Sequence, residues 1–533
     1  MPETKSLFSS SVHHWIYFVL LCLLAASMPT SRFMMSLTQL LLGANWLLEG
    51  NYREKILRFG KSRPALIFSS LYLLHIIGLL WSVDLAYGIG SDLKNKLPML
   101  TLTFMVASSR PLSRFKVHLL LYVFFASLLV TSFIGFYIFI KGDYLNFRHI
   151  SPYVSHIYLS MMLVMTAFTL PWLTQRITKN KKLIWGSYLV AIWMIAFLFI
   201  LRAMTGILCL GGVIVFLLLR KVYLLPEMRT RIIAGSLIAI LAIGSVVPLI
   251  WMYRQVSMEI KPDPESLLEL TSKGNPYQHY FTYNMRENGH YVYYFVAEEE
   301  VRNAWNQRSK LDFDGADLVG NELRATLFRY LSSMGLRKDH EGLMQLDQGD
   351  VSAIERGAPN HHYTRWPGFL VRVHQSVWEV YWYRESGNPS GHSLTQRMEL
   401  WRASFVAFRE KPWLGWGTGD LFIAVEYGLN AIDSQMDNFK MKPHNQYLLF
   451  LLTLGLLGSV FMYALYIFYV KTSRAYQYLP FNVFLVIMLI AMTGNHTIDS
   501  QTGQTFFTFF TLYFGILYRQ NYKTIGEDDK ALL

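Results

Sequence analysis

The sequence predicts an all-α protein that crosses a membrane about twelve times, and its composition and apolar runs carry that prediction. Of the 533 residues, 53% are hydrophobic and 16% are charged, whereas a soluble globular protein has about 25% charged residues. The apolar residues gather in separate runs of roughly 18 to 25, each long enough to cross a hydrocarbon layer as a helix. A β-barrel would instead show alternation over segments of about 10 residues.

The apolar runs predict spans at 15–28, 33–48, 64–81, 97–108, 117–140, 155–173, 183–201, 205–219, 232–252, 446–470, 481–493 and 504–518. Pro29 separates the first two spans, because proline cannot continue a helix. We expect the first run to remain as a span. Its cleavage as a signal peptide would leave an odd number of spans and reverse the orientation of the loops.

Basic residues gather in alternate loops, at 51–63, 110–116, 176–182 and 220–231. The loops between them, such as 82–96 and 142–152, hold fewer Lys and Arg residues. By the positive-inside rule, the basic loops and both termini are expected in the cytoplasm. The net charge of +13 therefore follows membrane topology, and we do not expect nucleic acid as a partner.

The spans divide the chain into four parts. Residues 1–252 hold spans one to nine, 253–443 form an extracytoplasmic loop domain, 444–520 hold the last three spans, and 521–533 are a cytoplasmic tail. No matching halves are visible, whereas many transporters are built from internal repeats. A large outer domain inserted late in the chain therefore favours an enzyme at the outer face of a membrane.

The loop domain is expected to be mostly helical. Asn288-Gly289 precedes a strand at 291–296, and helices follow at 298–310 and 323–334, the second ended by Gly335. The acidic residues at 312–317 do not follow the EF-hand order, so we expect a solvated turn there. No HExxH or CxxC pattern occurs in the outer loops, so we expect neither a metal nor another cofactor.

A glycine-rich segment follows an amphipathic helix that begins near Thr395 and stops at Pro412. Gly415, Gly417 and Gly419 stand at every second position, a pattern that lets backbone N–H groups face an anion. Gly417 and Gly419 are therefore candidates for binding a phosphate. A tight turn without a ligand is the alternative.

The most specific pattern begins directly before the tenth span. His444-Asn445 is followed by nine residues, Gly455, two residues and Gly458. This spacing resembles the carboxy-terminal motif of the O-antigen ligase and polymerase superfamily, and residues 397–419 resemble that family's segment of Arg, Trp, Pro and Gly-x-Gly. The twelve-span layout with its large ninth-to-tenth loop is also similar to the ligases, whose fold is GT-C-like.

The resemblance implies a donor, an acceptor and a place. Family members use undecaprenyl-diphosphate-linked glycans, and the ligases transfer the glycan to lipid A core in lipopolysaccharide biosynthesis. The implied location is the bacterial inner membrane, with the active site facing the periplasm and membrane lipids around the spans.

The same resemblance assigns roles to particular residues. An acceptor hydroxyl needs a base, and a histidine with an ordinary pKa near 6.5 suits that role, so His444 is the expected base, supported by Asn445. A histidine that only caps or packs is the alternative, and His496 is then the fallback base. Arg202 and Arg397 are expected to bind the diphosphate, because a guanidinium matches phosphate oxygens. Arg148 adds positive charge near the donor.

The sequence leaves several functions open. The first hypothesis is an inverting, metal-independent glycosyltransferase of the O-antigen ligase type. A protein O-oligosaccharyltransferase and an O-antigen polymerase share the motif and the donor, and differ in using a protein or a growing glycan as the acceptor. A transporter of lipid-linked glycans is the alternative without catalysis. For Arg202, snorkelling to the lipid headgroups is the rival account.

Overall fold

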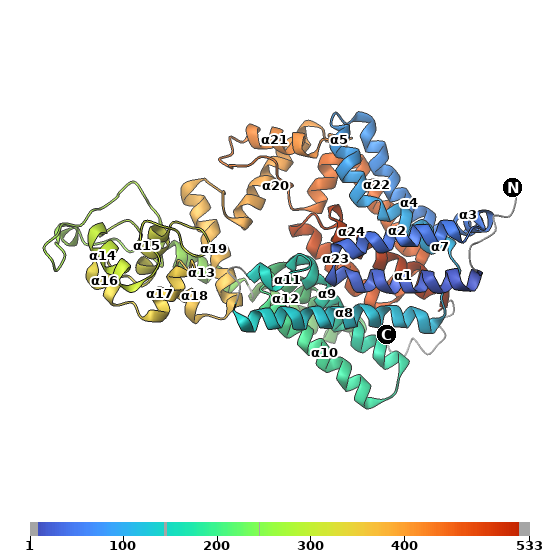
Figure 1. Cartoon of the computed structure of the whole chain (residues 1–533). Helices are drawn as coiled ribbons and strands as arrows, with labels where there is room; N and C mark the ends of the chain where they lie inside the picture. The colour runs from blue at the N-terminus through green and yellow to red at the C-terminus, as the bar shows by residue number, and fades with distance from the viewer. Residues whose placement is uncertain (1–8, 143–146, 245, 522–533) are drawn as a thin grey trace. The chain divides into compact units, whose positions relative to one another are not determined.

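The structure, a computed structural model, describes residues 9–142, 147–244 and 246–521, and these are mostly helical (Figure 1). The all-α prediction is confirmed. The chain forms two compact units, one of Met1–Gly142, Ile150–Leu217 and Arg397–Leu533, and the other of Asp143–His149 and Leu218–Gln396. Residues 397–443, which the sequence places in the loop domain, thus belong to the first unit. The expected tail at 521–533 lies outside the described residues except for Asn521.

The first unit holds most of the apolar helices. Its elements are α1 (Ser10–Thr30), α2 (Arg32–Leu48), α3 (Tyr52–Lys61), α4 (Arg63–Ile77), η1 (Gly78–Trp81), α5 (Leu85–Tyr87), η2 (Gly88–Leu93), α6 (Lys94–Lys96), α7 (Pro98–Ser108), α8 (Arg114–Lys141), α9 (His156–Ile177), α10 (Lys181–Ile200), α11 (Met204–Tyr223), α20 (Ser393–Glu410), α21 (Leu421–Ala431), α22 (Gln446–Ser473), η5 (Ala475–Gln477), α23 (Leu479–Gly494), η6 (Thr497–Asp499), α24 (Gln501–Leu512), η7 (Tyr513–Tyr518) and α25 (Arg519–Asn521). Helices α11 and α20 continue into the second unit.

Among the described residues, 8 helices are long and apolar enough to cross a membrane. They are α1, α4 with η1, α8, α9, α10, α11, the segment Met228–Ser257 and α22. The other four expected spans fall on α2, α7, α23 and α24 with η7, which are shorter or interrupted. Each expected span thus has a helix, while the count of twelve stays a prediction.

The first two spans separate at Ser31 rather than at Pro29. Pro29 lies in the last turn of α1, where its missing N–H removes one hydrogen bond without stopping the helix at once. Ser31 then leaves the helical conformation with φ −165°, and its side chain accepts a hydrogen bond from Met34 N–H at 3.2 Å. The break is therefore set by a capping serine two residues after the proline.

Helix α24 lies at the centre of the first unit. Its residues from Thr502 to Leu512 are all buried, and it contacts α7, α23 and α2 (Figure 1). Around it, α1 packs along α8 and α2, α9 packs on α10 and α23, and α22 packs on α4. Because the helices around it cover every face of α24, its Thr and Gln side chains are buried along with its phenylalanines.

The second unit contains most of the expected loop domain, residues 253–396. Its elements are η3 (Phe147–Ile150, of which Ile150 belongs to the first unit), α12 (Met228–Gly244), α13 (Val247–Ser257), η4 (Glu265–Leu268), β1 (Arg286–Glu287), β2 (His290–Tyr291), α14 (Glu298–Arg308), α15 (Leu323–Ser333), α16 (His340–Met344), α17 (Gln348–Glu355), α18 (His362–Arg365) and α19 (Gly368–Ser386). Helices α14 and α15 confirm the two helices expected at 298–310 and 323–334, and Gly335 follows the second with φ +73°. Their buried side chains, including Trp305, Phe328 and Tyr330, form one apolar core with Val292 and Val296.

The strand expected at 291–296 is much shorter than predicted. Asn288 and Gly289 turn the chain with positive φ, and only Arg286–Glu287 and His290–Tyr291 pair as strands. Further along, Phe295 has φ +53°, which no extended strand allows. The aromatic run therefore forms a bent segment rather than a strand.

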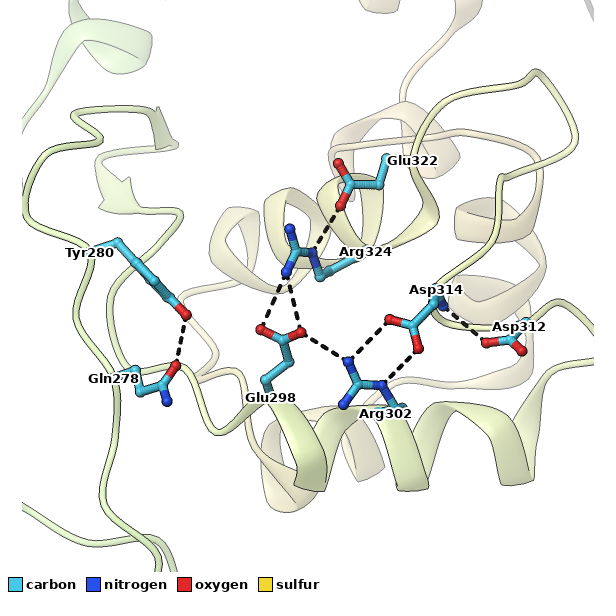
Figure 2. A network of polar contacts seen from close by, with 8 residues as sticks. All are labelled: Gln278, Tyr280, Glu298, Arg302, Asp312, Asp314, Glu322 and Arg324. Atoms are coloured by element: carbon cyan, nitrogen blue, oxygen red, sulfur yellow. Dashed lines mark hydrogen bonds and ion pairs between the residues drawn. The ribbon is translucent and has the colours of Figure 1, made fainter.

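The acidic turn after α14 is bonded to neighbouring side chains (Figure 2). The Asp314 carboxylate accepts hydrogen bonds from Arg302 at 2.9 and 3.1 Å, and Arg302 also pairs with Glu298 at 3.0 Å. Arg324 bonds to Glu298 and to Glu322 on the other side. These contacts form a surface network of ion pairs between α14 and α15.

Candidate active site

The motif histidine lies in the short segment between α21 and α22. His444 is half-buried and adopts φ +49°, a conformation that is uncommon outside glycine. Its neighbours fix it there. Trp401 Nε1 on α20 donates to the Pro443 carbonyl at 2.8 Å, and the Asn445 side chain caps α22 by accepting from Tyr447 N–H at 2.9 Å and Leu448 N–H at 3.1 Å. Asn445 thus supports His444 by starting the helix directly after it.

A second histidine faces the first. The rings of His444 and His496 lie with centroids 4.8 Å apart. Burial, together with the nearby charge of Arg397, lowers the pKa of His444 to about 4, while the Asn495 side chain acts in the opposite direction. Burial likewise lowers the pKa of His496 to about 3. Both imidazoles are therefore neutral at pH 7 and can accept a proton.

An ion network holds the segments that carry these histidines. Asp499 is fully buried and pairs with Lys96 at 2.9 Å and with Lys442, while Lys96 also pairs with Asp92. Burial alone would raise the pKa of Asp499, but Lys96 and Lys442 outweigh it and hold that pKa below its usual range. Lys442 stands two residues before His444 and Asp499 three residues after His496, so the network fixes both segments together.

Sequence reasoning did not single out Asp92, Lys96 or Lys442 as parts of the site. The available signal was the pair Asp92 and Lys96, one helical turn apart directly before an expected span, where charges are costly without partners.

Polar atoms beside the histidines lack partners. Among the described residues, His496 Nδ1 and Gln446 Nε2 are buried without a hydrogen bond. The other end of the Gln446 side chain accepts from Ile498 N–H at 3.1 Å, which orients it. Unsatisfied buried polar atoms are rare in native proteins, so this group is suited to a polar ligand.

The structure brings Arg397 close to the histidines. Arg397 lies on α20, is half-buried, and its charge acts on the pKa of both His444 and His496. The buried face of α20 includes Leu400, Ala403, Ser404 and Ala407, whereas Met398 and Phe405 are exposed. Helix α21 approaches this face closely and needs a glycine at position 428, because a Cβ there would lie 2.1 Å from the Ala403 carbonyl oxygen.

Arg202 lies in the turn between α10 and α11, half-buried and with φ +51°. One turn later, Gly206 packs on Ser160 of α9, where an added Cβ would come within 2.4 Å. Near the same end of α9, Tyr158 accepts hydrogen bonds from Asn495 at 3.3 Å and Ser500 at 2.6 Å. The first turn of α11, which follows Arg202, and the segment of His496 thus meet the same end of α9. Arg148 lies in η3 within the second unit.

Gly417 and Gly419 belong to a backbone junction rather than to an anion nest. The Trp416 and Gly417 N–H groups donate to the Leu452 and Thr453 carbonyls of α22 at 2.7 and 3.1 Å. The Gly419 N–H group donates to Ser82 Oγ at 3.0 Å. These N–H groups are therefore satisfied inside the protein and are not directed at a phosphate.

The same junction explains the glycine of the motif. Gly455 interrupts α22 with φ +66° and ψ −171°, which frees the carbonyls that the glycine-rich segment binds. An added Cβ on Gly455 would lie 2.3 Å from the Trp413 carbonyl oxygen, and one on Gly415 would lie 2.5 Å from the Gly455 nitrogen. Only glycines allow the two backbones to approach this closely. The motif therefore joins His444, directly before α22, to a break in that helix at Gly455.

Residues 363–463 match the family model described as O-antigen ligase. The chain carries the domain of the O-antigen ligase family. This O-antigen ligase domain includes Arg397, His444, Asn445 and the four glycines of the junction, at 415, 417, 419 and 455. Arg202 and Arg148 lie outside it. No curated protein matches the chain.

The O-antigen ligase domain and the apolar helices together define the protein at a coarse level. It is a multi-pass membrane protein of the glycosyltransferase type that functions in glycan assembly, with a lipid-linked glycan and an acceptor as partners. Among the described residues, no group of three or more His, Cys, Asp or Glu side chains is placed to hold a metal ion.

Proposed function

We propose that the protein transfers a glycan from undecaprenyl diphosphate to lipid A core at the periplasmic face of the bacterial inner membrane. The observation that carries this proposal is His444, held neutral beside Arg397 at the start of α22 within the matched O-antigen ligase domain. A protein or a growing glycan as the acceptor would use the same chemistry. The experiment below separates these acceptors.

In the proposed reaction, His444 accepts the proton of an acceptor hydroxyl. The hydroxyl oxygen forms a bond to the anomeric carbon, and the bond from that carbon to the diphosphate oxygen breaks. One in-line displacement inverts the configuration at the anomeric carbon. The leaving undecaprenyl diphosphate carries the negative charge away, and the protonated His444 releases its proton to water. The step needs no metal ion.

Arg397 is proposed to bind the diphosphate and stabilise the charge that develops on it. A bound diphosphate would also offset the positive charge that lowers the pKa of His444, so the base becomes stronger when the donor is in place. We assign Arg202 to the same diphosphate, because it lies just before α11, whose Gly206 packs on the end of α9 that contacts the His496 segment. Arg148 is proposed to add positive charge where the donor enters.

A lipopolysaccharide gel of a deletion strain tests the proposal. The strain is complemented with wild type, His444→Ala, Arg397→Ala or His118→Ala, and expression is checked by immunoblot. His118 is the matched control, because its ring packs against Tyr518 rather than against His496. We expect wild type and the control to restore the long-chain ladder, and the first two variants to leave lipid A core without it.

Two results would contradict parts of the proposal. Full ladder formation by His444→Ala at normal expression would exclude His444 as the base. An unchanged ladder in the deletion strain would exclude lipid A core as the acceptor, and secreted glycoproteins and glycan chain length would then be compared between the strains.

A further inference from the structure

The second unit contains a pocket that the catalytic proposal does not use. It has a volume of about 200 Å³, smaller than the roughly 300–1,000 Å³ of drug-sized ligand sites, so it suits a single small group rather than a longer chain. Its lining comes from segments far apart in the sequence, and includes Ser266, His290, Tyr291, Tyr294, Arg337 and Lys338. We name it the Tyr291 pocket.

One wall of the Tyr291 pocket is aromatic. The rings of Tyr291 and Tyr294 stack with centroids 4.3 Å apart and an interplanar angle of 9°. The Tyr291 hydroxyl donates to Glu259 Oε1 at 2.5 Å, so the platform is held in place. Flat aromatic side chains with a polar edge suit ligands that have one apolar face and hydroxyl groups around it, as a sugar ring does.

The pocket lining also includes a buried lysine, Lys338. Lys338 is 3% exposed, its Nζ donates to the Tyr291 carbonyl at 3.0 Å, and it forms no ion pair with any residue that the structure describes. An ammonium group has three donors, so two are left for a ligand. Burial lowers the pKa of Lys338 to about 7, with Asp339 opposing. An anion in the pocket would favour the charged form of this lysine.

The backbone beside Lys338 is strained. Phe295, another lining residue, has φ +53°. Its carbonyl accepts a hydrogen bond from Lys338 N–H at 3.0 Å, and its own N–H donates to His279 Nδ1 at 3.2 Å. Arg337 packs over the Phe295 ring with 4.7 Å to its centroid. A bulky residue in the left-handed region costs free energy, and such strain gathers at binding sites.

We propose that the Tyr291 pocket binds a sugar residue that carries a carboxylate or a phosphate. The sugar ring lies against the stacked pair of Tyr291 and Tyr294, and the anionic group meets Lys338 and Arg337, whose guanidinium also pairs with Glu269. This inference rests on the proposed function, because an enzyme that transfers glycans has a use for a second contact to one of them. The second unit then binds part of a glycan substrate at a site of its own.

Saturation-transfer NMR on the full-length protein in lipid nanodiscs tests the inference. The probes are methyl β-glucuronoside, glucose 6-phosphate and the neutral methyl β-glucoside. The variants are Lys338→Met, which keeps the apolar stem, and Tyr294→Leu. The matched control is Tyr283→Leu, because Tyr283 is 56% exposed and its ring contacts Tyr293 outside the pocket.

We expect at least one anionic probe to bind about tenfold more tightly than the neutral one, and each pocket variant to weaken it about tenfold. The control variant and His444→Ala should bind as wild type does. Equal binding of neutral and anionic probes, no binding of any probe, or unchanged binding by both folded pocket variants would overturn the inference. The lipopolysaccharide gel with His444→Ala tests transfer and does not depend on this pocket. A failure of the proposed function is therefore distinguished from a failure of sugar binding.

Discussion

The rings of His444 and His496 lie with centroids 4.8 Å apart, where the segment before α22 meets the segment after α23. Each segment also carries one partner of a buried ion pair, Lys442 on the first and Asp499 on the second. Two pairwise contacts therefore fix one segment against the other. This arrangement holds a neutral base in one place, which is what proton transfer to a positioned group requires.

The first prediction concerns pH. A base acts while it is neutral, so kcat/KM should stay level from pH 8 downward and fall as pH passes the lowered pKa of His444, about 4. The charge of Arg397 contributes to that lowering. Arg397→Gln should therefore move the acid limb of the profile toward pH 6.5, in addition to lowering the rate. Transfer rates of the purified protein between pH 4 and 8 measure both effects.

The control for the pH profile is a measurement of whether the protein stays folded at each pH. Near-UV circular dichroism at each pH separates titration of the base from acid unfolding. An acid limb at the same pH in wild type and Arg397→Gln would show that Arg397 does not act on the titrating group.

The second prediction concerns the buried ion network. Asp499→Asn leaves Lys96 and Lys442 without their shared carboxylate, and an unpaired buried charge costs about 3–5 kcal/mol. We expect a lower midpoint of thermal unfolding in detergent and loss of transfer. Glu410→Gln is the control, because Glu410 is exposed and bonds only to the exposed Tyr427 hydroxyl among the described residues.

A double variant sharpens this test. Lys96 keeps its pair with Asp92 in Asp499→Asn, so adding Lys442→Met removes the cation that has lost its carboxylate, and part of the lost stability should return. If the double variant is less stable than Asp499→Asn by the full cost of Lys442→Met alone, the two residues are not coupled.

Much of the fold and part of the site follow from the sequence alone. Apolar runs place the helices, because a bilayer requires about 20 apolar residues per span and forbids open backbone. His444 is found because its spacing to Gly455 and Gly458 is local and specific. Arg397 lies close enough in the structure for its charge to act on His444, and its role toward a diphosphate stays a prediction.

The rest of the site depends on contacts between distant residues. Lys96 and Asp499 are 403 positions apart, and no local pattern pairs them. The glycines after Pro412 permit either an anion nest or a tight backbone contact, and only the break in α22 decides for the second. The bend at Phe295 is likewise imposed by tertiary hydrogen bonds on a sequence that favours a strand.

The third prediction concerns the helix break. Gly455→Ala places a Cβ in the left-handed region and 2.3 Å from the Trp413 carbonyl oxygen. The conformational cost alone is about 1–2 kcal/mol, and the close contact adds to it. We expect a lower unfolding midpoint and reduced transfer. Gly186→Ala on α10, with open space around it, should instead raise the midpoint, since alanine is about 1 kcal/mol better than glycine in a helix. Equal behaviour of the two variants would contradict the junction.

The last prediction concerns the position of His444. Trp401→Phe keeps an aromatic ring on α20 but removes the hydrogen bond from Nε1 to the Pro443 carbonyl, 2.8 Å long. That bond contributes about 1 kcal/mol and restrains the residue directly before the base. We expect kcat to fall several-fold with little change in KM, since substrate contacts remain while the base is held less firmly. Trp413→Phe is the control, because its ring is 62% exposed. A rise in KM at constant kcat would mean that Trp401 binds substrate instead of positioning His444.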